Sequence, residues 1–146
     1  MKAITTAIEF FSEEELKCKG DGTIKLDPRF AKALPELRRK WGMPLTPTSV
    51  CRTPQHNAKV GGNPRSLHLT ENPKWQTFGT MAADISWRDW HKEKKLMFAK
   101  TAWEMGWSIG LHNGFCHIDR RSDAGLNQSV FLYGEWDNEF EAKDIT

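Results

Sequence analysis

Two histidines and one aspartate form the most informative chemical pattern in this chain. His68 follows a loop rich in Gly and Pro, Asp84 lies in an Ala-rich segment, and His117 lies after an Asn-Gly pair. Two imidazoles and one carboxylate form a ligand set that holds zinc and leaves a fourth position for water or substrate. A lone histidine is more often a packed or solvated residue, so the zinc hypothesis requires that all three side chains converge.

Short strands are predicted to position these side chains. The predicted strands cover residues 45–51, 81–86, 107–111, 115–119 and 130–133. Asn113-Gly114 favours a tight turn, so the third and fourth strands should form a hairpin. Because side chains alternate along a strand, Phe115, His117 and Asp119 should share one face of it.

Helices are predicted on both sides of these strands. A capping box at residues 12–15 starts a short helical turn, and longer helices are predicted at 28–42, 54–60 and 87–106. The acidic tail from Glu135 onward is predicted to lie at the surface. No repeat or linker divides the chain, so we expect one α+β domain over residues 1–146, with a small antiparallel sheet flanked by helices.

Composition limits the classes of function. The net charge of +2 and the scattered basic residues do not favour a nucleic-acid binder. No apolar run reaches the ~18 residues that a membrane span needs. The N-terminus lacks a signal-peptide pattern, so we expect a cytoplasmic protein unless another protein releases it. Cys18, Cys51 and Cys116 form no CxxC pair and are expected to be reduced and buried.

Four segments, in this order, resemble the zinc D-alanyl-D-alanine carboxypeptidase family. They are SVCRTPQHN (49–57), VGGNPRSLH (60–68), MAADI (81–85) and GFCHID (114–119). That family includes phage endolysins and vancomycin-resistance dipeptidases, and it shares its fold with the hedgehog signalling domain. The resemblance covers roughly residues 10–121. It implies a hedgehog/DD-peptidase-like fold and one zinc ion bound by His68, Asp84 and His117.

The resemblance also implies substrate-binding residues. Arg52 would hold a carboxylate or carbonyl of the peptide, and Ser66 would line the site. Gln55, in the same matching segment as Arg52, is a further substrate-binding candidate. The rigid fork of donors of an arginine suits a carboxylate, although an ordinary surface salt bridge is the alternative for Arg52.

The chain departs from the family pattern between the first two ligands. The family usually places the first His close to the Asp, whereas residues 69–83 separate them here. Residues 71–78 look like an inserted loop. Trp75 and Phe78 on this loop either form a wall or lid of the substrate cleft or pack the loop onto the domain.

A second departure concerns the general base. Several family branches carry a carboxylate or a histidine shortly before the last ligand, but Gly114 and Phe115 occupy those positions here. Asp119 is the best candidate base, followed by His112. Asp119 could equally orient a ligand or pair with one of the two arginines that follow it.

These observations predict a zinc metallopeptidase, either a carboxypeptidase or an endopeptidase, that cuts an amide bond in bacterial peptidoglycan. The setting we expect is a phage-type endolysin, a monomer held in the host cytoplasm until release and acting on the cell wall without membrane insertion. The alternative is a non-catalytic zinc-containing module of the same fold that binds a partner.

Overall fold

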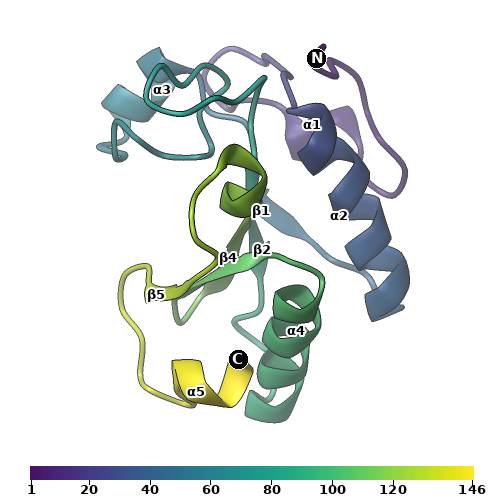
Figure 1. Ribbon diagram of the computed structural model, residues 1–146, viewed down its shortest axis with the longest axis vertical. Helices are drawn as coiled ribbons and strands as arrows, with labels where there is room; N and C mark the ends of the chain where they lie inside the picture. Colours follow the sequence, from purple (N-terminus) through teal and green to yellow (C-terminus); the bar gives the residue numbers. More distant parts are fainter.

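The computed structural model describes residues 1–146 and shows an α+β fold around a five-stranded sheet (Figure 1). The strand order is β1-β2-β4-β3-β5, and only the β3–β5 pair is parallel. The strands are β1 Pro47–Ser49, β2 Ala82–Ser86, β3 Ser108–Leu111, β4 Phe115–Asp119 and β5 Val130–Leu132. The predicted fold class is confirmed, and the architecture is compatible with the hedgehog/DD-peptidase-like fold.

Helices surround this sheet. They are α1 Glu13–Leu16, α2 Pro28–Trp41, α3 Pro54–Lys59, α4 Lys92–Glu104 and α5 Ala142–Ile145, with a 3-10 turn, η1, at Arg121–Ala124. In Figure 1, α3 and its loops lie above the sheet, and α4 and α5 lie below it. α2 and α5 pack against α4, which also contacts β3. None of these helices combines the length and the apolar character that a membrane-spanning helix needs.

Local sequence signals explain where two helices begin. The Ser12 hydroxyl accepts from the Glu15 backbone N–H, and the Glu15 carboxylate accepts from the Ser12 N–H, which completes the predicted capping box. Asp27 caps α2 by accepting from the Arg29 N–H, and Pro28 occupies the first helical position.

One face of the sheet packs on a continuous aromatic and aliphatic core. Phe30 from α2 meets Trp107 edge to face at 5.9 Å, and Phe98 from α4 is fully buried. Cys116 and Ile118 point into this core, whereas His117 and Asp119 alternate with them on β4. All three cysteines are free and buried. The core therefore fixes the strands whose opposite face carries the candidate site.

Two predicted features differ in part from the structure. Helix α4 begins at Lys92, because residues 87–91 form a turn in which the Trp90 N–H donates to the Trp87 carbonyl. The acidic residues of the C-terminal tail lie mostly at the surface, as predicted, but Phe140 and Ile145 of the same segment are buried in the main core. Apolar contacts bury these two side chains, while the acidic side chains around them stay at the surface.

Candidate metal centre

Two paired strands and one loop bring the candidate ligands together. Asp84 on β2 lies directly opposite His117 on β4 in the antiparallel register. His68 comes from the loop after α3, where its carbonyl accepts from the Arg52 N–H at 2.9 Å and from the Thr80 hydroxyl at 2.8 Å. These contacts fix the backbone of the loop residue relative to the sheet.

The three side chains form a compact, buried cluster. Asp84 Oδ1 lies 3.1 Å from His68 Nε2 and 3.0 Å from His117 Nδ1. One ligand atom from each residue lies within 4.8 Å of the other two. His68, Asp84 and His117 are 0%, 5% and 3% exposed. This His-Asp-His group could hold a metal ion.

Each histidine has one ring nitrogen that faces Asp84 and one that faces away from it. The hydrogen-bond partner of the nitrogen that faces away indicates where the ring carries its proton. His68 Nδ1 lies 2.8 Å from the Val50 carbonyl, which can only accept, so Nδ1 carries the proton. His117 lies between two carboxylates, with Nε2 2.8 Å from Asp119 Oδ2 and Nδ1 3.0 Å from Asp84 Oδ1. We assign its proton to Nε2, because Nδ1 is the nitrogen that faces the candidate metal position. In neutral rings, His68 Nε2 and His117 Nδ1 therefore direct lone pairs at Asp84, an arrangement that fits a bound cation.

Electrostatics also favour a cation at this cluster. Burial raises the pKa of Asp84, but when the imidazoles of His68 and His117 are protonated their charges and hydrogen bonds outweigh it, so the pKa lies below its ordinary value. Burial similarly opposes ionisation of Asp119, yet His117 and Arg121 lower its pKa to about 2. Both carboxylates are thus ionised at neutral pH in a buried site.

Asp119 is held from two sides. Its Oδ1 accepts from the backbone N–H and the Nε of Arg121, each at 3.0 Å, and its Oδ2 accepts from Arg121 Nη2 at 2.8 Å as well as from His117. Asp119 contacts the ring nitrogen of His117 that faces away from Asp84. This geometry favours an orienting role over that of a general base.

Arg52 and Ser66 lie beside the cluster. Arg52 Nη2 is 4.0 Å from Asp84 Oδ2, and its Nη1 donates to Asn57 Oδ1 at 3.1 Å. Its side chain is 14% exposed, which differs from the surface salt bridge considered as the alternative. The Ser66 hydroxyl accepts from the His68 N–H at 3.1 Å.

A hollow of about 360 Å³ opens next to His117. Ser66, Trp75 and Asp119 also line it, and the Trp75 indole N–H donates to the Arg65 carbonyl. Trp75 therefore forms part of a wall of this hollow. Phe78, the other aromatic residue of the inserted loop, instead lies 5.7 Å from the Arg29 guanidinium.

Two sequence candidates lie apart from the cluster. Gln55 is exposed on α3 and lines a separate hollow with Gly20 and His56. The ring of His112 stacks on Phe115 with centroids 4.1 Å apart, and its Nδ1 accepts from the Gly114 N–H. The structure thus does not bring either side chain into contact with the His-Asp-His group.

A residue that the sequence reasoning missed does contact the cluster. The ring of Tyr133 stacks on His117, with centroids 4.2 Å apart and an interplanar angle of 21°. Tyr133 also lines the hollow beside His117. The available signal was the alternation of Phe131 and Tyr133 at the last predicted strand, which places both aromatic side chains on one face.

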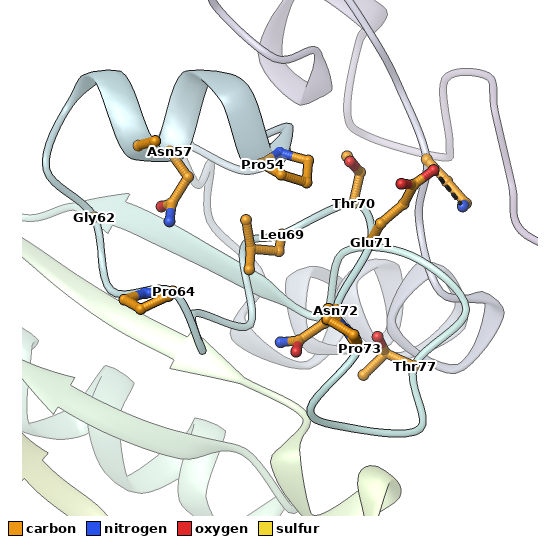
Figure 2. A pocket seen from close by; sticks show the side chains of 12 residues that line it. Pro54, Asn57, Gly62, Pro64, Leu69, Thr70, Glu71, Asn72, Pro73 and Thr77 are labelled. Atoms are coloured by element: carbon orange, nitrogen blue, oxygen red, sulfur yellow. Dashed lines mark ion pairs between the residues drawn. The ribbon is translucent and has the colours of Figure 1, made fainter.

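The largest hollow, about 800 Å³, is a separate feature between α3 and the inserted loop (Figure 2). Figure 2 shows Leu69 between Asn57 on α3 and Pro73 on the loop. Glu71 and Lys25, which also line this hollow, form an ion pair of 3.5 Å. None of the three candidate metal ligands lines it. Size alone would therefore select the wrong hollow for the chemistry.

Comparison with known proteins agrees with this geometry. The family model described as Peptidase M15 matches residues 9–119, a span that contains His68, Asp84 and His117 and ends at Asp119. No curated protein and no solved structure matches the chain.

Proposed function

The chain belongs to the peptidase M15 family of zinc-dependent metallopeptidases, and on this premise we propose that it hydrolyses an amide bond in the stem peptide or cross-bridge of bacterial peptidoglycan. The observation that carries the proposal is the convergence of His68, Asp84 and His117 on one buried point. The resemblance of their flanking segments to peptidoglycan carboxypeptidases supports the substrate class.

The donor set fits one zinc ion. His68 Nε2, a carboxylate oxygen of Asp84 and His117 Nδ1 would hold it, because these atoms already face one another. When bound, zinc polarises a carbonyl and lowers the pKa of water toward ~7.

The side chains around the cluster would bind and align the peptide. Arg52 would pair with a carboxylate or carbonyl of the substrate, since its guanidinium lies close to Asp84 and is mostly shielded from solvent. Ser66 and Trp75 would contact the peptide along the hollow. In the reaction the oxygen of water bonds to the carbonyl carbon, the C–N bond breaks, and a proton from water ends on the amine.

The charge of the hollow supports an acidic peptide as substrate. Arg65, Arg121 and Asp119 line it, and since Arg121 pairs with Asp119, the exposed Arg65 supplies the positive charge. Stem peptides carry free carboxylates, which such a surface would attract. We propose a phage-type endolysin, acting as a monomer, that stays in the host cytoplasm until release and then acts on the wall.

The test is digestion of purified peptidoglycan by the zinc-loaded protein, with assay of released amino groups and mass spectrometry of the fragments. Free D-alanine would identify a carboxypeptidase, and separated cross-linked peptides an endopeptidase. His117→Ala should lose at least 1,000-fold in rate, of the order that loss of core catalytic machinery costs. His91→Ala, at an exposed helix N-cap, is the matched control. Release of no amino groups by the wild type would refute the proposal.

A non-catalytic zinc module is the second candidate. The observation that favours it is that Gly114 and Phe115, three and two residues before the last candidate ligand, carry no group able to accept a proton. Such a module would bind zinc and sediment with peptidoglycan yet release no new amino groups. The same digestion therefore separates the two functions.

A further inference from the structure

Tyr133 is the only tyrosine of the chain, and it lies beyond the span matched by the family model. Its backbone N–H donates to the Leu111 carbonyl at 2.9 Å, which extends the parallel pairing of β5 with β3 by one residue. This pairing places the tyrosine ring against His117, at the stacking distance given above. The C-terminal segment thus supplies a side chain to the site.

The stack is built into the sheet by a glycine. Gly110 lies opposite both His117 on β4 and Phe131 on β5. A Cβ at Gly110 would lie 2.9 Å from the Cβ of His117 and 2.9 Å from the Cβ of Tyr133, closer than such atoms approach. The absence of a side chain at this position lets the imidazole and the phenol meet face to face.

The surroundings of the phenol place it at the reacting end of the site. Burial and the nearby Asp84 carboxylate raise the pKa of Tyr133, and the charge of Arg52 opposes them. The ring lies against the candidate zinc ligand His117 and lines the hollow in which the substrate would bind. A neutral phenol there is a hydrogen-bond donor in a partly desolvated hollow.

We propose that Tyr133 is a catalytic residue that donates a hydrogen bond to the carbonyl oxygen of the scissile amide as this oxygen gains negative charge. The inference rests on the proposed hydrolysis and adds a role for a residue outside the family match. When water oxygen bonds to the carbonyl carbon, the C=O electron pair moves onto oxygen, which accepts the hydrogen bond from the phenol. The electron pair returns as the C–N bond breaks, and the phenol keeps its proton throughout.

Tyr133→Phe isolates the hydroxyl, because phenylalanine preserves the ring that stacks on His117. We expect kcat on soluble peptidoglycan fragments to fall about 100-fold, the usual effect of losing one oxyanion donor. KM and zinc affinity should stay within about a factor of two of the wild-type values. The melting temperature should stay within about two degrees of that of the wild type. Tyr133→Leu removes the ring as well and should also weaken zinc binding, which measures the packing contribution separately.

Binding of acetohydroxamate to the zinc-loaded protein, measured by calorimetry, gives a readout that does not need turnover. The Tyr133→Phe variant should bind this probe about tenfold more weakly, as expected for one lost hydrogen bond. If the wild type cleaves no peptidoglycan but this loss is seen, the substrate proposal fails and the donor role of Tyr133 stands. Unchanged kcat with unchanged probe affinity would overturn the role, as would a kcat loss that only follows a loss of zinc.

Discussion

The two ring nitrogens of His117 have different partners, and this difference assigns roles to its neighbours. Nδ1 faces Asp84, whereas Nε2 is bonded to Asp119, which Arg121 holds in turn. A carboxylate behind a ligating histidine fixes the tautomer and the ring orientation and raises the basicity of the ligand. We therefore infer that Asp119 orients His117, the candidate ligand, and does not act as the general base.

Asp119→Ala should weaken zinc binding 10- to 100-fold, the usual effect of removing such a supporting group. Competition with a chromogenic chelator measures the affinity. The control is Asp123→Ala, since Asp123 pairs with Arg120 at 2.9 Å and does not contact His117. Unchanged zinc affinity together with lost turnover would instead indicate that Asp119 is the base.

Asp27 is a second buried carboxylate, and it links the helix α2 cap to the inserted loop. It accepts from Arg29 and from the Phe78 backbone N–H. Burial raises the pKa of Asp27, but these donors outweigh it and the net shift is downward. A carboxylate with a lowered pKa stabilises the fold above its unfolded pKa, and the contribution is lost as pH falls through the folded pKa.

Asp27→Asn should therefore cost about 1–3 kcal/mol of unfolding free energy at pH 7, because hydrogen bonds to a charged group are lost. The difference from wild type should shrink as the pH is lowered to about 3, below the ordinary carboxyl pKa of 3.8, because the unfolded wild-type chain then binds the proton that the folded carboxylate resists. Urea denaturation at the two pH values measures both. Asp89→Asn, at an exposed position, is the control. An equal cost at both pH values would contradict the ionic origin.

At the scale of elements, the hairpin of β3 and β4 could be predicted from the sequence, but the pairing of β3 with β5 could not. Asn113-Gly114 and the alternation around His117 are local signals, and the structure has the hairpin within one residue of the prediction. The parallel pairing of β3 with β5 joins segments that no local pattern links. The contact of Tyr133 with His117 could therefore not be predicted from the sequence. The same limit applied to Gln55, whose motif neighbourhood gave no information on which way α3 turns its side chains.

Gly110→Ala tests the packing of β3 against the site. The new methyl group would meet the Cβ atoms of His117 and Tyr133, and overpacking of this kind costs about 1–3 kcal/mol. We expect weaker zinc binding as well, because the His117 ring must move. Gly114→Ala is the matched control in the same hairpin, since its nearest contact is the mobile end of Arg88. Wild-type stability and zinc affinity in Gly110→Ala would contradict the proposed close fit.

At the scale of the whole molecule, the main core includes residues from Phe11 to Ile145. The sequence predicts one domain with a C-terminal tail at its surface. The burial of Phe140 and Ile145 was not predicted, because acidic residues dominate the composition of this segment. Phe140 packs against Trp136 with ring centroids 5.0 Å apart and against Trp87 at 6.3 Å. The segment beyond the family match therefore contributes to the core as well as to the site.

Phe140→Ala should destabilise the protein by about 3 kcal/mol, at the lower end of the cost for a buried aromatic side chain because it lies at the edge of the core. The wild type and the Phe140→Ala variant should each unfold in a single thermal transition if residues 1–146 form one cooperative domain. Met97→Ala, at an exposed position of α4, is the control and should change stability little. A second transition, or no loss of stability, would contradict the inclusion of the tail in the core.

The most direct measurement is an anomalous-scattering map from crystals of the zinc-loaded protein, recorded at the zinc edge. The account predicts one strong peak about 2.0–2.2 Å from His68 Nε2, from an Asp84 carboxylate oxygen and from His117 Nδ1. A peak held by other residues, or no peak between these three side chains at saturating zinc, would contradict it.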